Sequence, residues 1–160
     1  DELHEAARTH RAGLALVDRR REEFRADHAR RPPRVMTSDG EIVVGRYRRD
    51  DVPPGALVGT AVSTGTVEGR ARVVRALTDA DVAPGEILVT VQTDPSWTPA
   101  FVTAAALVTE VGGTMTHGAV IAREYGIPAV VGVEDATRVI ADGRRIRVDG
   151  TAGYVELLAD

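Results

Sequence analysis

The stretch GGTMTHGAVIAREYGIPAVVGV, from Gly112 to Val133, carries the strongest structural signal in this sequence. A glycine pair follows an apolar run and precedes a segment of helix-forming residues, which predicts a strand, a tight turn and a helix that starts beside His117. Gly126 is placed to end this helix, and Pro128 stops its continuation. A further strand is therefore expected from Pro128 onward.

The predicted helix has one apolar side and a start that suits an anion. Val120, Ile121 and Tyr125 are spaced to share one face, and we expect that face to be buried. The exposed N–H groups of the first turn, together with the positive end of the helix dipole, favour negative charge. Glycines beside such a start allow an anion to approach the backbone closely, because they carry no Cβ.

His117 lies at this start, where a neutral imidazole can act as a nucleophile. A phosphoryl group on the ring would lie beside the N–H groups that stabilise it. We expect Gly112, Gly113 and Gly118 to shape the turn and leave room for a donor. Thr116 is expected to cap the helix or to bond a ring nitrogen. From the residues alone, a surface histidine in a glycine-rich turn is the more common interpretation, and no metal site is predicted.

The composition is that of a globular protein without disulfides. The chain has 160 residues, 43% of them hydrophobic and 28% charged, with no cysteine and a net charge of −4. Its 20 basic residues are all Arg, so a P-loop lysine is absent and a self-contained kinase is not expected. The sequence shows neither a membrane-spanning apolar run nor a basic stripe for nucleic acid. A cytoplasmic location is the default expectation.

Proline-rich breaks divide the chain into three parts. Residues 1–31 are rich in Ala, Leu, Arg and Glu, and they predict a helical linker that ends an upstream module. A helix packed on the main domain is an equal alternative. Residues 32–55 predict a connector with a possible short strand at Ile42 to Val44, and residues 56–160 predict the compact domain. Because the chain opens without Met and in mid-helix, we expect it to be a piece of a longer polypeptide.

Strand and helix patterns alternate from Ala56 onward. The expected fold class is α/β, a domain of β-strands with few helices. Strands are predicted at Thr66–Val74, 86–91, 105–110, 128–133, 144–150 and 153–157, and a short helix is predicted at 134–140. The last two strands are expected to pair with each other and to close the domain.

The long string around His117 closely resembles the phosphohistidine swivelling domain, or mobile domain, of the phosphoenolpyruvate-utilising enzymes. The shared frame is Gly-Gly, three residues, His, two small residues, an apolar turn, Ala-Arg-Glu and Gly-Ile-Pro-Ala-Val. The resemblance spans Leu57 to Leu158 and includes TDPSWTPAF and DGRRIRVDGTAGYVEL. It implies a swivelling β/β/α domain, in which an ATP-grasp module phosphorylates the histidine and a third module supplies the acceptor.

The family frame also assigns individual residues. His117 falls on the phosphorylated histidine, and Gly112 and Gly113 fall on the turn glycines. Arg123 and Trp97 are interpreted as structural residues. Where synthases and dikinases have Thr two residues before the histidine, this sequence has Met115. The strings MTHGAV and RPPRVMTSDGE look most like the rifampicin phosphotransferase branch of the family.

Three functions stay open at this point. The first is a phosphohistidine carrier that passes its phosphoryl group to a rifamycin-type antibiotic. The second is a carrier like those of phosphoenolpyruvate synthase and pyruvate dikinase, with pyruvate as the acceptor. The third is a non-catalytic swivelling module, which a buried or acid-engaged His117 would favour. The resemblance implies that ATP and Mg²⁺ bind the missing ATP-grasp module, that this chain binds no cofactor itself, and that its partners are modules of the same polypeptide.

Overall fold

A charged helix forms the described part of the first of two compact units, residues 1–46 and 47–160. The computed structural model describes Arg8, residues 14–30 and residues 49–159 of the chain. Helix α2 (Leu14–Ala29) ends just before RRPPR, as the prolines predict. The remainder of the predicted helix and the possible strand at Ile42 to Val44 lie outside the described residues.

Charge surrounds α2 on every side. Glu23 pairs with Arg19 at 3.8 Å and with Arg20 at 2.5 Å, one turn away along the helix. Phe24, an apolar residue of the predicted heptad seam, is 68% exposed. The helix is therefore polar all round, with ion pairs between residues one turn apart. Among the described helices, none has the length and apolar composition needed to cross a bilayer.

The second unit is built on one long strand, β3 (Thr66–Val74), which pairs in two sheets. Its first half runs antiparallel to β7 (Arg145–Asp149), and β7 pairs in turn with β8 (Tyr154–Leu157). Its second half runs parallel to β4 (Ile87–Thr90). The strand and closing pair predicted from these segments are therefore confirmed.

Two more parallel strands extend the second sheet beyond β4. They are β5 (Ala106–Thr109) and β6 (Ala129–Val131), each within the segment that predicted it. Every residue of β4, β5 and β6 is buried, because both faces of this sheet are covered. The short apolar runs in the sequence reflect that burial.

Two short strands that the sequence pattern did not predict close the sheet. β1 (Leu57–Val58) pairs with β8, and β2 (Thr60–Ser63) pairs antiparallel with β6. Because the two sheets share β3, all eight strands follow one order, β1-β8-β7-β3-β4-β5-β6-β2. This order begins and ends with the strands on either side of Gly59, so the combined sheet almost closes into a barrel. A Cβ at Gly59 would lie 2.7 Å from the carbonyl oxygen of Val131, so the closure needs glycine there.

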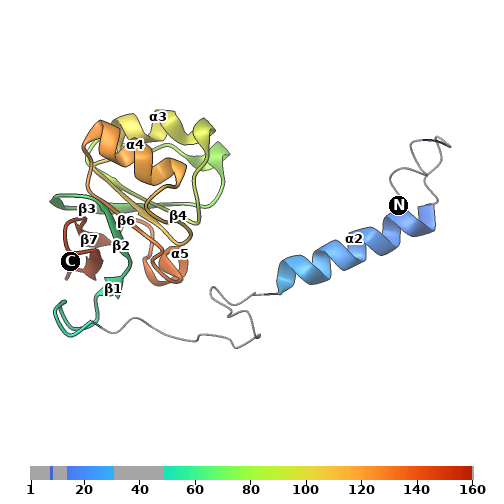
Figure 1. Cartoon of the computed structure of the whole chain (residues 1–160), viewed down its shortest axis with the longest axis horizontal. Coiled ribbons are helices and arrows are strands. Elements are labelled where there is room, and N and C mark those ends of the chain that lie inside the picture. The colour runs from blue at the N-terminus through green and yellow to red at the C-terminus, as the bar shows by residue number, and fades with distance from the viewer. Residues whose placement is uncertain (1–7, 9–13, 31–48, 160) are drawn as a thin grey trace. The chain divides into compact units, whose positions relative to one another are not determined.

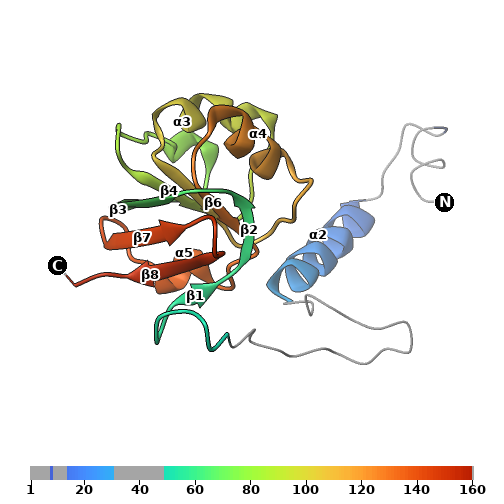
Figure 2. The ribbon, with the colours of Figure 1, turned by 60° about the vertical axis from the view of Figure 1, so that its left-hand side comes forward.

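The domain has three layers, which are visible in Figures 1 and 2. Helices α3 (Thr98–Thr103) and α4 (His117–Tyr125) cover one face of the β4–β6 sheet, and β7 and β8 lie on the other side. Alternate residues face alternate cores: Leu88 packs with the helices, whereas Val89 packs between the sheets with the short helix α5 (Ala136–Val139). The predicted β/β/α fold class is confirmed.

The buried face of α4 differs from the predicted one. Val120 and Tyr125 are 36% and 48% exposed, and Ile121 is only partly buried. Small residues form the buried face: Gly118, Ala119 and Ala122. The prediction was wrong because periodicity weighs large apolar side chains, whereas a helix that lies close to a sheet needs small ones there.

The entry to the second unit supplies a test of the domain boundaries. Arg49 contacts the carbonyl oxygen of Ala152 and forms an ion pair with Asp51, so part of the expected 32–55 connector lies against the domain.

We expect residues 47–160 alone to unfold cooperatively at the Tm of the whole chain, and a chain that starts at Pro54 to melt lower because it lacks Arg49. Calorimetry on the three chains measures this. Loss of cooperativity in residues 47–160 would show that the first unit contributes to the core.

Candidate functional site

The turn between β5 and α4 positions His117 as the first residue of the helix, as predicted. Thr116 has the extended backbone of an N-cap residue, with φ −70° and ψ 156°. Its N–H and its hydroxyl both donate to the carbonyl oxygen of Gly113, at 3.1 and 2.9 Å. The hydroxyl therefore closes the turn, and it neither caps α4 nor bonds the imidazole as we expected. The first N–H groups of α4 thus donate no hydrogen bond to the side chain of their N-cap residue.

The imidazole of His117 is half-buried and lies against an aromatic ring. The rings of His117 and Phe101 meet edge to face, with centroids 6.4 Å apart and planes at 77°. Phe101 is 1% exposed, so the core fixes its position. The Nε2 atom of His117 is buried and has no hydrogen-bond partner among the described residues. A buried polar atom without a hydrogen-bond partner lowers the stability of the fold by about 1–3 kcal/mol. A role in catalysis is one explanation for keeping such an atom.

The loop after β4 brings a carboxylate near the imidazole. Asp94 begins the short helix η2 (Pro95–Trp97), and its carboxylate accepts hydrogen bonds from the hydroxyl of Ser96 and, at 2.8 Å, from the Ser96 N–H. These two bonds lower the pKa of the Asp94 carboxyl, and the nearby charge of His117 lowers it further. The site therefore combines a half-buried imidazole with an ionised carboxylate that is held by its own loop.

Gly118 is buried against protein rather than beside an open path to the imidazole. A Cβ there would lie 2.5 Å from Oγ1 of Thr93, 3.2 Å from Cδ2 of Leu107 and 3.8 Å from Cζ of Phe101. We expected this glycine to leave room for an incoming nucleotide. The structure instead shows that it allows α4 to approach β5 and the 93–97 loop.

The two turn glycines have different surroundings. A Cβ at Gly112 would lie 3.2 Å from Cβ of Val131 and 3.3 Å from the hydroxyls of Thr109 and Thr116, and the φ of Gly112 is +156°. A Cβ at Gly113 would meet no other atom within 4 Å. Gly112 thus serves the tight turn, and open space lies next to Gly113.

Two residues of the family frame have structural contacts. Trp97 is 6% exposed and packs in the helix-side core. The guanidinium of Arg123 donates to the carbonyl oxygen of Val62 at 3.2 Å and ties α4 to β2. Both contacts agree with our structural interpretation of these residues. Met115, at the position that departs from synthases and dikinases, is 83% exposed.

Sequence reasoning missed two neighbours of the candidate histidine, Asp94 and Phe101, and it missed Thr93, whose hydroxyl faces Gly118. They lie in the 93–101 stretch that the family resemblance includes. No local spacing connects that stretch with His117, because the contact forms only when α3 and α4 pack over the same sheet. In the described residues, no group of three or more His, Cys, Asp or Glu is arranged to hold a metal ion.

With this geometry established, comparison with known proteins identifies the class. Residues 82–153 match the family described as PEP-utilising enzyme, mobile domain, where PEP is phosphoenolpyruvate. The chain therefore carries a mobile domain of the PEP-utilising enzyme family.

Within this family the chain is similar to rifampicin phosphotransferases. It is 64% identical over 159 residues to the one from Streptomyces sviceus and 59% identical over 157 residues to the one from Bacillus subtilis strain 168. These matches cover 99% and 98% of this chain but 18% of each relative, so the chain spans less than a fifth of their length.

A solved structure supports the fold. Aconitase X from Thermococcus kodakaraensis superimposes with a TM-score of 0.53 and 26% sequence identity, covering 65% of this chain and 98% of that one. The UPF0107 protein solved by NMR superimposes with a TM-score of 0.50 at 22% identity. Both likenesses concern the fold.

Gly118→Ala tests the close packing of α4. We expect this variant to lose about 1–3 kcal/mol of unfolding free energy, because β-branched Thr93 and fully buried Leu107 cannot easily move away from a new Cβ. Gly113→Ala is the matched control and should change stability by less than about 0.5 kcal/mol. Urea unfolding of both variants measures the difference. Equal stabilities would contradict the contacts described for Gly118.

The lowered pKa of Asp94 predicts a pH dependence of stability. An Asp whose folded pKa is lowered stabilises the fold above its ordinary pKa of about 3.9, and this contribution disappears as pH falls through the folded pKa. Asp94→Asn should therefore be less stable than the parent at neutral pH, and the difference should shrink as the pH falls through the lowered pKa of Asp94. Urea unfolding at neutral pH and at a series of acidic pH values checks this, with exposed Glu124→Gln as the control for a lost carboxylate. A difference that persists in acid would assign the effect to packing.

Proposed function

We propose that this domain is the phosphohistidine carrier of a multidomain ATP-dependent phosphotransferase, and that His117 accepts the phosphoryl group. The observation that carries the proposal is an imidazole at the first position of α4 whose Nε2 has no partner among the described residues. The match to the mobile-domain family supports the same assignment. The donor would be ATP, bound with Mg²⁺ on an ATP-grasp module elsewhere in the longer polypeptide.

The start of α4 would stabilise the phosphorylated ring. A ring nitrogen attacks the β-phosphorus of ATP, the bond from that phosphorus to the oxygen of AMP breaks, and AMP leaves. Hydrolysis then releases the terminal phosphate, and the β-phosphoryl group stays bonded to nitrogen. The N–H groups of the first turn and the helix dipole then face the new negative charge. The open space at Gly113 gives that charge room beside the turn.

Phe101 and Asp94 would act as positioning residues for the imidazole. Phe101 holds the ring through its edge-to-face contact, and Asp94 favours a ring orientation that directs a protonated nitrogen toward its carboxylate. Because Nε2 is buried, transfer at that atom requires the ring to turn when the donor module docks. Docking would thus couple the position of the domain to the reactivity of the ring.

A non-catalytic swivelling module is the less well supported alternative. A buried or acid-engaged His117 would favour it, and the buried Nε2 and the nearby Asp94 carboxylate go some way in that direction. His117 is half-buried, and both hydrogen bonds described for the Asp94 carboxylate come from Ser96.

The acceptor we propose is a rifamycin-type antibiotic. Curated proteins named rifampicin phosphotransferase are 64% and 59% identical to this chain across nearly its whole length. The acceptor would bind on a module outside this chain, since the chain spans 18% of those relatives.

Labelling tests the phosphorylated residue. The whole polypeptide, incubated with ATP labelled at the β-phosphate, should acquire an acid-labile, base-stable label on the domain. His117→Ala should abolish the label, because the nucleophile is absent. A variant with His4, His10 and His28 all replaced by Gln is the matched control and should keep it. Label that survives in His117→Ala would sink the assignment.

A chase experiment tests the acceptor. The labelled polypeptide is freed of ATP and mixed with rifampicin or with pyruvate. We expect rifampicin to remove the label from the protein and to become phosphorylated, while pyruvate leaves the label in place. Transfer to pyruvate alone would reject the rifamycin acceptor and retain His117 as the carrier.

A further inference from the structure

A charged cleft lies at the opposite end of the parallel strands from His117. Its volume is about 700 Å³, and it is lined by Arg70, Ala141, Asp142, Gly143, Arg144 and Arg145. Arg70 lies next to Ala71, which pairs with the first residue of β4, so the cleft is at the end where the parallel strands begin. His117 comes after β5 in the chain, at the end where the parallel strands finish. The cleft is therefore separate from the candidate phosphohistidine site, and its chemistry is independent of the function proposed for His117.

Positive charge dominates this cleft, although the chain as a whole has a net charge of −4. Among the described lining residues, three arginines accompany a single carboxylate, that of Asp142. That carboxylate is already engaged, because Oδ1 accepts the N–H of Val73 at 2.8 Å and Oδ2 lies 3.5 Å from the guanidinium of Arg72. Arg72 thus balances the charge of Asp142, which leaves the three lining arginines without a further carboxylate among the described lining residues.

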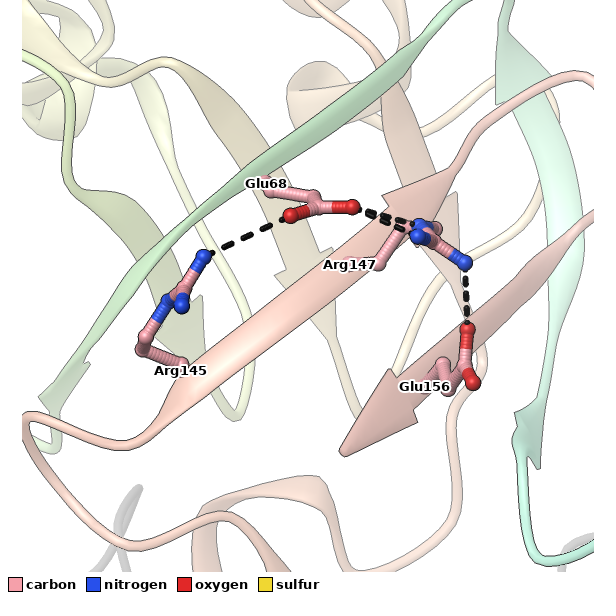
Figure 3. Close-up of polar contacts among 4 residues, drawn as sticks. All are labelled: Glu68, Arg145, Arg147 and Glu156. Atoms are coloured by element: carbon pink, nitrogen blue, oxygen red, sulfur yellow. Dashed lines mark hydrogen bonds and ion pairs between the residues drawn. The ribbon is translucent and has the colours of Figure 1, made fainter. Parts of the chain in front are cut away.

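Two of these arginines face each other across a strand pair. Arg70 of β3 and Arg145 of β7 are in direct register, and like charges directly opposite one another destabilise an antiparallel pair. The sheet face nearby follows the opposite rule, as Figure 3 shows: Arg147 lies between Glu68 at 2.6 Å and Glu156 at 2.8 Å. Glu68 also pairs with Arg145 at 3.5 Å, so this carboxylate is shared between two arginines. The cross-strand pair of Arg70 with Arg145 still departs from the charge pairing of the rest of this surface.

The walls of the cleft are held in place by hydrogen bonds. The N–H of Gly143 donates to the carbonyl oxygen of Ala71 at 2.7 Å. The N–H of Ala71 donates to the carbonyl oxygen of Arg144 at 2.8 Å. The guanidinium of Arg70 donates to the carbonyl oxygen of Gly143 at 2.9 Å. A cleft fixed in this way loses little conformational freedom when a ligand binds.

We propose that this cleft binds a multiply charged phosphate anion. Guanidinium groups match phosphate oxygens with paired, charge-assisted hydrogen bonds, and a dianion would offset the repulsion between Arg70 and Arg145. Ala141 is the single apolar residue type with a side chain among the described lining residues, so we expect the arginines rather than an apolar pocket to hold the ligand. The ligand is recognised through its phosphates, whether these are inorganic or belong to a nucleotide.

A titration of the whole chain followed by ¹H–¹⁵N NMR tests this site. With pyrophosphate at constant ionic strength, saturable shifts should cluster at residues 70–72 and 141–146. Arg145→Gln should weaken binding about 10-fold, since a hydrogen bond between charged groups is lost, while its Tm stays equal or rises as the like-charge contact disappears. Arg138→Gln, which removes an exposed arginine from α5, should bind as the parent does. We expect ADP to bind about as tightly as pyrophosphate and AMP to bind much more weakly. This result would show that the cleft recognises the diphosphate group, whether it is inorganic or part of a nucleotide.

Three outcomes would overturn the proposal. Shifts spread over the surface, or confined to residues 113–120, would assign the binding elsewhere. Equal loss of affinity in Arg145→Gln and Arg138→Gln would reduce it to non-specific charge. AMP that binds more tightly than pyrophosphate would show that the cleft recognises the nucleoside. If Arg145→Gln fails to fold, Arg70→Gln takes its place with the same expected loss of affinity.

Discussion

The close approach of α4 to the sheet at Gly118 is the contact on which the candidate site depends. A Cβ at this position would lie 2.5 Å from the Thr93 hydroxyl, so the helix lies as near to the 93–97 loop as glycine permits. That proximity places the His117 ring against Phe101 and near the Asp94 carboxylate. A larger residue at position 118 would move the start of α4 away from both groups. His117 would then lose its contact with Phe101 and its proximity to the Asp94 carboxylate.

The parallel strands make this proximity possible. β4, β5 and β6 run in the same direction and are buried on both faces, so the loops that follow β4 and β5 leave the sheet at one edge. In open α/β sheets, such edges are where ligands bind. Here the loop after β4 contributes Asp94, and the loop after β5 leads into His117. The near-closure of the sheet at Gly59 holds β6 and β2 beside this edge.

Local patterns explain how much of this could be predicted from the sequence. The alternation over Thr66–Val74, the buried runs and the Gly-Gly turn before His117 are signals within single segments, and the structure confirms the elements they predicted. The strands on either side of Gly59 are too short to show a period. The buried face of α4 and the neighbours of His117 result from packing between distant segments, and spacing along one helix contains no information about them.

Among the described residues, the imidazole of His117 has a ring contact with Phe101 and no hydrogen-bond partner for Nε2, which suits a group proposed to receive and release phosphate. A carrier that stabilised its phosphorylated form strongly would slow the second transfer as much as it assisted the first. A helix start contributes only about 0.3–1 kcal/mol to an exposed anion, and the Asp94 carboxylate opposes excess negative charge beside it. The buried Nε2 without a described partner raises the free energy of the unphosphorylated ring as well. We therefore expect neither state of the proposed carrier to be strongly favoured, so that docking to one module or the other would decide the direction of transfer.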